Sequence, residues 1–251
     1  MNKEELMLQK HLIDLSETAY KRDIVTFSDF LNLNELNILH STPKNMFSAN
    51  YETYGGYEAS ERQMVAFLPD ALYYEYSYPV SVLKIVPSAP KFAEQLTHRD
   101  YLGAVLNLGI ERCKIGDLLI GEKECILFVC DSISRFIIDN LTRIRHTSVT
   151  AAEIPPSDFS YTPAFQEIKG TVASVRLDTV LSVAFPLSRS KLTGFITDGK
   201  VFVNGRLITS NGYHLKERDV ISVRGMGKIS YNGVLSETKK GRFYITVNKY
   251  V

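Results

Sequence analysis

The sequence lacks tryptophan, has only three cysteines and contains no long apolar run. The cysteines, Cys113, Cys125 and Cys130, are odd in number and form no Cys-x-x-Cys pair, which argues against both a disulfide framework and a zinc ribbon. The longest apolar stretches, such as Ile126–Cys130, are far shorter than the roughly 18–20 residues of a membrane span, and the charged N-terminus has no secretory signal core. We therefore expect a cytoplasmic protein that does not enter a membrane.

What the chain does have is an ordinary globular composition over 251 residues, with 45% hydrophobic and 23% charged residues. Proportions this close to the globular average exclude long disorder and fibrous repeats. At about 150 residues per domain, the length suggests one large domain or two to three small ones.

The formal net charge of +1 hides an uneven distribution of charge. Residues 181–251 contain 12 Lys and Arg against 4 Asp and Glu, whereas residues 1–180 contain 17 against 24. A basic segment on a mildly acidic body is a reason to expect a polyanion partner such as nucleic acid. On charge alone, a small β-rich module that carries lysine for solubility remains an equal alternative.

Periodicity predicts a mainly helical N-terminal region over residues 1–75. Apolar residues recur at three-to-four spacing over residues 3–21, which predicts a first helix. Ser28 is expected to cap a second helix, and Pro43 to end it. A tyrosine- and glycine-rich segment, residues 50–69, follows without a predicted element.

Residues 76–155 alternate between strand and helix signals in the order β-α-β-β-α-β. This order predicts a ferredoxin-like domain. The expected elements are a strand over 80–87, a helix over 96–109, a hairpin over 114–130 that turns near Gly121, a helix that Asp131 caps with Ile133, Phe136, Ile137, Leu141 and Ile144 as its buried stripe, and a closing strand within 145–154.

The last part of the chain changes period again after a proline-rich stretch. Residues 156–169 are expected to be a linker, since PPSDFSYTP (155–163) resists regular structure. Residues 170–251 are expected to form a small α+β domain, so that the whole chain is an α+β protein in three parts. Its expected elements are a helix over 176–185, a short helix from Ser188 to Gly199, a hairpin over 200–208 with a type I′ turn at Asn204-Gly205, a strand over 219–225 and a hairpin over 234–247.

Strings that resemble catalytic or metal-binding motifs do not have the spacing that their chemistry needs. His98-Arg99-Asp100 resembles a kinase catalytic loop, but Val105 stands where that loop requires asparagine. Gly225-Met226-Gly227 is a lone Gly-x-Gly between predicted strands, and the histidines and cysteines are not at ligand spacing. We expect no catalytic residue, metal, cofactor or small-molecule substrate.

One string keeps an enzyme open as an alternative. Pseudouridine synthases carry their catalytic aspartate in an Arg-Leu-Asp string, which stands here at Arg176–Asp178. A Thr-Ser-Gly-like segment follows in those enzymes, whereas Thr179-Val180-Leu181 follows here and continues the helical pattern. Asp178 is better explained as a residue in the first turn of a helix, where the helix dipole favours a carboxylate.

The basic segment has a better case as a phosphate-binding surface. Ser188, Arg189, Ser190 and Lys191 fall in the first turn of a short predicted helix, where free backbone N–H groups and the positive end of the dipole favour an anion. If the helices pack on the small sheet, we expect these groups and the cations at hairpin tips and strand ends to converge on one face. The further RNA-binding candidates are Arg176, Lys200, Asn204, Gly205, Arg206, Arg224, Lys228, Lys239, Lys240 and Arg242.

The run RLDTVLSVAFPLSRSKLTGFITDGKVFVNGRLI (176–208), followed by DVISVRGMGK (219–228), resembles the alpha-L RNA-binding domain, which is named after the fourth small-subunit ribosomal protein. The shared pattern is Arg-Leu-Asp, then Ser-Arg-Ser, then Gly-x-Val-x-Val-Asn-Gly and Asp-x-Ile. The resemblance implies that Arg176, Arg189 and Lys191 lie on RNA-facing helices, and Lys200 and Asn204 on the hairpin. Many relatives have a second basic residue beside Arg189, whereas serines flank it here.

Three further stretches resemble the bacterial YlmH family, namely GGYEASER (55–62), THRDYLGAVLNLGIERCKIGD (97–117) and ETKKGR (237–242). The resemblance implies a cytoplasmic, non-enzymatic RNA-binding protein of the large ribosomal subunit. Such proteins hold ribosomal RNA and tRNA in quality control of stalled chains. Because the family's genes neighbour cell-division genes, a protein adaptor in the division machinery is a second alternative.

The middle domain is expected to be a scaffold or a protein-contact domain. Its strand ILFVC (126–130) lacks the paired exposed aromatic residues with which RNA-recognition folds stack bases. Tyr51, Tyr54 and Tyr57 are candidates for base stacking, but packing within their loop explains them equally well.

Overall fold

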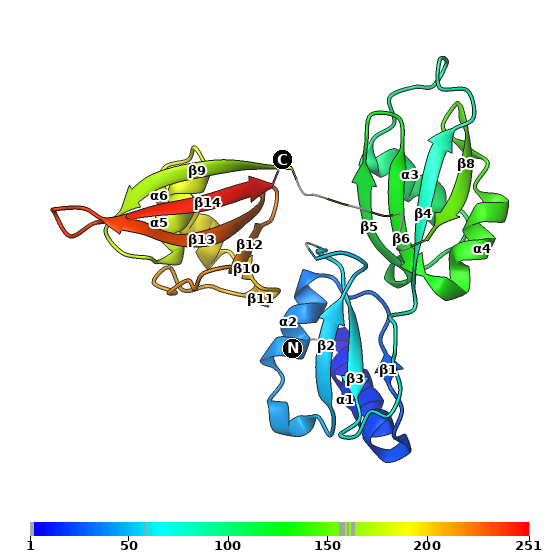
Figure 1. The fold of residues 1–251 in the computed structure, drawn as a ribbon, viewed down its shortest axis with the longest axis horizontal. Coiled ribbons are helices and arrows are strands. Elements are labelled where there is room, and N and C mark those ends of the chain that lie inside the picture. The colour runs from blue at the N-terminus through cyan, green and yellow to red at the C-terminus, as the bar shows by residue number, and fades with distance from the viewer. Residues whose placement is uncertain (1–2, 59, 156–158, 160, 162–163, 251) are drawn as a thin grey trace. The chain divides into compact units, whose positions relative to one another are not determined.

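The computed structural model describes residues 3–58, 60–155, 159, 161 and 164–250. The chain divides into two compact units, Met1–Tyr161 and Thr162–Val251, which are drawn in Figure 1. In the described part of the chain, no helix is both long enough and apolar enough to cross a membrane.

The N-terminal region of the first unit combines helices with a small sheet. The sheet order is β1-β3-β2. The tyrosine- and glycine-rich segment, for which the sequence predicts no element, contains two strands. One of them, β3 with the sequence MVAFL, is buried on both faces and shows no alternation. The elements are α1 (Lys3–Arg22), β1 (Thr26–Phe27), α2 (Leu33–Ser41), a 3-10 turn (Lys44–Met46), β2 (Asn50–Tyr54) and β3 (Met64–Leu68).

The second helix begins later than expected, because Asn32 and not Ser28 caps it. Asn32 Oδ1 accepts hydrogen bonds from the amides of Asn34 and Glu35 at 2.9 and 3.2 Å, and Glu35 Oε2 accepts from the amide of Asn32 at 2.6 Å. This reciprocal capping box satisfies several donors of the first turn. Ser28 instead pairs with β3, where its Oγ accepts from the amide of Val65 at 2.9 Å.

The middle part of the first unit has the ferredoxin-like fold that the sequence predicts. The sheet order is β5-β6-β4-β8-β7 and every neighbouring pair is antiparallel, as the split βαβ arrangement requires. Three details differ from expectation: Cys130 and not Asp131 is the N-cap of α4, Phe136 is 47% exposed, and two residues of the expected stripe lie beyond the helix, Leu141 as its C-cap and Ile144 in the next strand. The elements are β4 (Val80–Pro87), α3 (His98–Leu106), a 3-10 turn (Arg112–Lys114), β5 (Ile115–Ile120), β6 (Cys125–Cys130), α4 (Asp131–Asn140), β7 (Arg143–Ile144) and β8 (Thr147–Ile154).

The two faces of this sheet pack against different parts of the protein. Leu127 and Val129 of β6 face the helices and form a core with residues such as Val105 of α3 and Ile137 of α4. Phe128 alternates with them and faces the N-terminal region, where it is fully buried together with Phe30, Met64, Val82 and Cys130. The face with which RNA-recognition folds stack bases is therefore covered by the protein itself.

Arg62 joins the N-terminal region to the middle sheet. Its side chain is almost completely buried, and its guanidinium donates to the carbonyl oxygens of Ile115, Phe30 and Arg112 at 2.8, 3.0 and 3.2 Å. Burial acts to lower the pKa of Arg62. A charged group that is buried away from water needs hydrogen-bond partners in the protein, and three carbonyl oxygens fill that need for Arg62.

The glycines before Arg62 allow this close approach. A Cβ on Gly55 would lie 2.1 Å from the carbonyl oxygen of Arg62, and a Cβ on Gly56 would lie 2.3 Å from the ring of Phe128. Tyr57 then stacks on Phe128 with ring centroids 5.0 Å apart and donates to Asp117 at 2.8 Å. Gly55, Gly56, Tyr57 and Arg62 of this string therefore serve packing, and Tyr57 lies partly buried against the core cluster of Phe128.

The second unit is a six-stranded antiparallel sheet with two helices on one face (Figure 1). The predicted apolar stripe of Leu177, Val180, Leu181 and Ala184 is buried against the sheet. The sheet order is β11-β10-β12-β13-β14-β9. The elements are β9 (Phe165–Val172), α5 (Leu177–Ala184), α6 (Arg189–Thr197), β10 (Val201–Val203), β11 (Arg206–Leu207), β12 (Val220–Val223), β13 (Gly227–Glu237) and β14 (Phe243–Tyr250).

Strand β9 takes up residues that were expected in the linker over 156–169. It begins at Phe165 and pairs with β14 along its whole length. As an edge strand with the polar sequence FQEIKGTV, it gives only a weak apolar signal. Within the expected linker, residues 156–158, 160 and 162–163 lie outside the described residues.

Candidate nucleic-acid interface

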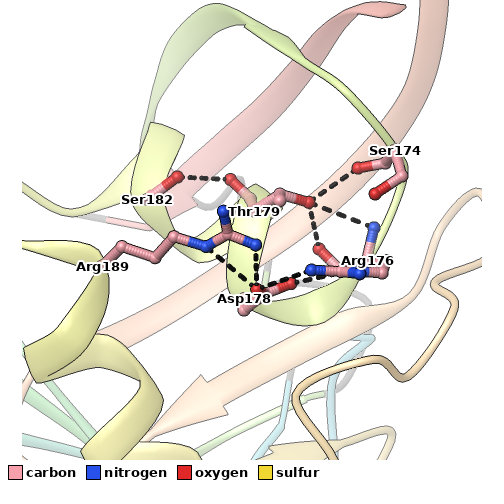
Figure 2. Close-up of polar contacts among 6 residues, drawn as sticks. All are labelled: Ser174, Arg176, Asp178, Thr179, Ser182 and Arg189. Atoms are coloured by element: carbon pink, nitrogen blue, oxygen red, sulfur yellow. Dashed lines mark hydrogen bonds and ion pairs between the residues drawn. The ribbon is translucent and has the colours of Figure 1, made fainter.

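The side chain of Asp178 holds two of the candidate RNA-binding arginines (Figure 2). Arg176 donates to it in bidentate fashion, from Nε to Oδ1 at 3.2 Å and from Nη2 to Oδ2 at 3.1 Å. Arg189, from the start of α6, donates Nε to Oδ2 at 3.0 Å and adds a short bond from Nη2. The beginnings of α5 and α6 are thus joined through one carboxylate.

The burial of these groups differs in a way that suits recognition of an anion. The side chain of Asp178 is 5% exposed, whereas those of Arg176 and Arg189 are 38% and 55% exposed. Burial acts to raise the pKa of Asp178, but the hydrogen bonds from Arg176 and Arg189 outweigh it, and the pKa is lowered. Asp178 is therefore ionised at neutral pH, and the two guanidinium groups are fixed with part of their surface toward solvent.

The helix start around Arg176 is itself well satisfied. Thr179 Oγ1 accepts from the amide of Arg176 at 3.2 Å and donates to the carbonyl of Ser174 at 2.7 Å. Ser182 donates to the carbonyl of Thr179 at 2.7 Å (Figure 2). The backbone that carries Arg176 and Asp178 is therefore rigid, which fixes the point from which the arginine extends.

Helix α6 starts beside Ser188, where the sequence predicts a short helix to begin. Ser188 is the N-cap residue, and its Oγ accepts from the amide of Lys191 at 3.4 Å. Ser190 Oγ lies 3.2 Å from Ser188 Oγ. Other amides of the first turn have no acceptor within the helix by geometry, so the turn offers backbone donors beside the exposed Arg189 and Lys191.

The β10–β11 hairpin adds a second element on the helix side of the sheet. Lys200 Nζ lies 5.2 Å from the centroid of the Phe195 ring of α6 and 3.3 Å from Asp198 Oδ2. Arg206 is exposed and pairs with Val203, whose side chain belongs to the core beneath the helices. Lys200 and Arg206 therefore share the helix-bearing side with Arg189.

The side chain of Asn204, a residue of the turn itself, stabilises the turn of this hairpin. Asn204 and Gly205 have φ values of 49° and 77°, as a type I′ turn requires. Asn204 Nδ2 donates to Asp219 Oδ1 at 2.8 Å, and its Oδ1 accepts from the amide of Val220 at 2.9 Å. Both polar atoms of the Asn204 side chain are thus hydrogen-bonded within the fold, so the groups that the turn offers to a ligand are mainly those of its backbone.

The register places Arg224 and Lys228 on the opposite face of the sheet. Residues that pair directly across neighbouring strands have their side chains on the same face of the sheet. Phe202 of β10 pairs with Ser222 of β12, and Ser222 pairs with Lys228 of β13. Arg224 lies over the Phe202 ring at 5.3 Å. The expectation that all candidate cations converge on one face is therefore wrong for these two residues.

The cations of the last hairpin form a separate group. The amide of Tyr231 in β13 bonds to the carbonyl of Asp219, beside the β10–β11 hairpin. From Tyr231 the strand continues to Glu237, a length of roughly 20 Å at about 3.3 Å per residue. Lys239 and Lys240 are exposed at the turn, and Arg242 donates to the carbonyl of Thr171 at 3.0 Å. These residues lie at the turn of the β13–β14 hairpin, beside the end of β9.

One cation on the helix side was not among the candidates. Lys249 is paired with the buried Ile229 and lies 5.2 Å from the centroid of the Phe185 ring at the end of α5. The alternation of ITVNK along β14 places it on the same face as Ile245 and Val247. We define the helix-side surface as Arg176, Ser188, Arg189, Ser190, Lys191, Lys200, Arg206 and Lys249.

The strings that resemble catalytic motifs have structural roles. Asp100 caps α3, where it accepts from the amide and hydroxyl of Thr97 at 2.8 and 2.6 Å. Gly225 and Gly227 have φ values of 77° and 111° in the turn between β12 and β13.

Among the tyrosines that are candidates for base stacking, Tyr51 packs in the aromatic cluster of Phe47 and Phe67.

Two family models match the chain. One is described as "Putative RNA-binding domain in YlmH" and matches residues 75–158, and the other is the S4 domain and matches residues 175–221. The second match confirms the resemblance to the domain named after the fourth small-subunit ribosomal protein.

Two known proteins are similar over larger parts of the chain. The structure of cell division protein ylmH from Streptococcus pneumoniae shares the fold, with a TM-score of 0.50 and 24% identity over 63% of this chain and 95% of that chain. The ribosome-associated protein quality control protein P2 of Bacillus subtilis (strain 168) is 31% identical over 196 residues, which are 78% of this chain and 76% of that protein. A match of that identity and extent, together with both domain matches, shows that this chain belongs to the YlmH family.

Proposed function

We propose that this protein is a ribosome-associated RNA-binding protein that acts without catalysis. The helix-side surface binds the sugar-phosphate backbone of ribosomal RNA and tRNA on the large ribosomal subunit, in quality control of stalled chains. Because its proposed partner is the ribosome, we infer that the protein acts in the cytoplasm. The relative from Bacillus subtilis, whose name includes ribosome association and quality control, supports this proposal.

The observation that carries the proposal is the arrangement of Arg176 and Arg189 around Asp178. A guanidinium whose one edge is bound by a carboxylate keeps its remaining N–H groups directed outward, and such planar donors match phosphate oxygens. Positioned arginines beside the open first turn of α6 recognise phosphate without reading bases. The burial of Asp178 and the hydrogen bonds to both of its oxygens support a structural role for this residue in place of a catalytic one.

The test measures binding of the full chain to purified large ribosomal subunits from 50 to 300 mM salt by sedimentation. We expect affinity to fall steeply with salt, with roughly 0.7–0.9 log units per phosphate contact for each tenfold rise in salt. Arg189→Ala weakens binding by about tenfold and reduces the slope by about one contact. Arg135→Ala is the matched control, because Arg135 is an exposed arginine that pairs only with Asp139 on α4 in the described residues. Binding without a salt slope, or an unchanged Arg189→Ala variant, contradicts the proposal.

A further inference from the structure

The first unit carries an arginine-rimmed hollow on the helical side of its middle sheet. The hollow has a volume of about 490 Å³ and lies between α3 and the segment that leads from the end of α4 into β7. Its lining includes the apolar residues Gly103, Ala104 and Leu108, which we call its floor, together with the polar residues Asn107, Asn140 and Thr142. Arg99, Arg143 and Arg145 contribute the rim. We call this feature the α3–β7 groove.

The charge of the groove is positive and is only partly compensated within the protein. Asp100 is the acidic residue in its lining, and it caps α3 and lies 3.6 Å from Arg145 Nη1. Arg145 also approaches Glu94 at 3.7 Å. In the described part of the chain, the exposed Arg99 and Arg143 have no ion-pair partner, so two full charges are available to a polyanion.

Packing within the protein does not explain why a glycine stands at the floor of the groove. Gly103 lies in the interior of α3, where glycine is less favourable than alanine. A Cβ built on Gly103 would meet nothing within 4 Å, so the fold itself does not require glycine there. The missing side chain leaves the helix backbone accessible beside Ala104, with room for a flat group to lie against it.

The other face of the same sheet is closed to RNA. Phe128, the aromatic residue of β6, is fully buried beneath Phe30, Tyr57 and Met64 of the N-terminal region. A ferredoxin-like domain with this cover has no exposed aromatic platform on β6 for bases. Any contact of the domain with RNA must therefore use its helical side or its edges.

The geometry points to the α3–β7 groove as a binding site for a single-stranded segment of RNA. A base or ribose lies on the apolar floor at Gly103 and Ala104, while the neighbouring phosphates contact Arg99 and Arg143. Arg145 stands in the left-handed region, with a φ of 52°, at the two-residue turn between β7 and β8 and completes the rim. This inference rests on the proposed function and adds to it a second contact, on a different unit from the helix-side surface.

The test uses the full chain and a fluorescent single-stranded 12-nucleotide polyuridine as the probe, with large ribosomal subunits measured in parallel. We expect the double variant Arg99→Ala/Arg143→Ala to bind the probe about tenfold more weakly. Its salt slope should be reduced by roughly 1.4 log units, which is the value for two phosphate contacts on a single strand. Arg135→Ala, which removes an exposed arginine of the same domain outside the groove, should bind as the unchanged protein does.

Gly103→Leu separates shape from charge. Leucine favours the helix and its side chain fills the floor, so the variant should fold normally and still lose probe binding without a change in net charge. If Arg99→Ala/Arg143→Ala and Gly103→Leu bind normally while Arg189→Ala does not, the groove proposal is overturned and the proposed function stands. If Arg189→Ala also binds normally, both are overturned. Displacement of the probe by polyglutamate at equal charge concentration would assign the groove to an acidic peptide instead.

Discussion

Asp178→Asn separates two roles that a buried carboxylate can have beside two arginines. Asparagine keeps the size of the side chain and one acceptor oxygen, but removes the charge. The side chains of Arg176 and Arg189 are 38% and 55% exposed and can turn to water, so no buried charge is left without a partner. We expect the free energy of unfolding of the second unit to fall by about 1–2 kcal/mol, close to the value for hydrogen bonds with charged groups and below that for a stranded buried charge.

The effect on RNA binding follows from two opposing terms. Removal of the carboxylate adds about 0.7 kcal/mol of attraction to a phosphate roughly 6 Å away in water, and salt reduces this gain. Against it, Arg176 and Arg189 lose their fixed orientation, and ordering such a side chain at an interface costs about 0.5–1.5 kcal/mol each. Because two side chains are affected, the second term is larger. We expect affinity for large ribosomal subunits to fall by about threefold to tenfold.

The control is Asp198→Asn, which makes the same change of charge in the same unit. Asp198 is exposed and contacts Lys200 at 3.3 Å, and surface pairs of this kind contribute about 0–1 kcal/mol. This variant should bind RNA equally or slightly more tightly. Sedimentation with large subunits measures affinity, and hydrogen exchange of residues 177–184 measures local stability. Tighter binding by Asp178→Asn would refute the reasoning, because Asp178 would then only neutralise the arginines.

Two further predictions concern stability. The pKa of Asp178 is lowered in the folded protein, so its ionised form contributes stability that is present above the unfolded pKa of about 3.9 and is lost as the pH falls through the folded value. The difference in hydrogen exchange between the unchanged protein and Asp178→Asn should therefore be largest above about pH 4 and shrink as the pH falls below it. A difference independent of pH would contradict the assignment. Gly56→Ala places a Cβ 2.3 Å from the ring of Phe128 at a φ of 103°, so we expect a loss of about 3 kcal/mol in the stability of the first unit, with exchange in the second unit unchanged, measured by the same method.

The parts of the fold that the sequence predicts well are those with a clear period. The β-α-β-β-α-β order of the middle domain and the stripe of α5 follow from alternation and three-to-four spacing. Strand β3 was missed because the N-terminal region covers it on one side and the middle domain on the other, which removes the alternation. Arg62 was missed because a charged residue is expected at the surface, and three distant carbonyl groups hold it inside.

The candidate site was predicted by residue type but not by arrangement. Spacing identifies the start of α6 and the type I′ turn, because both are local. Whether Lys228 shares a face with Arg189 depends on the register of β12 with β13, which one sequence does not determine. The pairing of Asp178 with Arg189 spans eleven residues and a turn, so no local rule predicts it.

The Arg-Leu-Asp and Ser-Arg-Ser strings, which the sequence presents as separate motifs, are one physical unit in the structure. The aspartate of the first binds the arginine of the second, and the arginine of the first binds the same carboxylate from the other side. A carboxylate that serves as a catalytic group must reach its substrate, whereas Asp178 is 5% exposed and both its oxygens accept hydrogen bonds. The chemistry of the Arg-Leu-Asp string therefore depends on what faces it. Here an arginine from the next helix faces it, so the string holds two partly exposed guanidinium groups around one buried carboxylate.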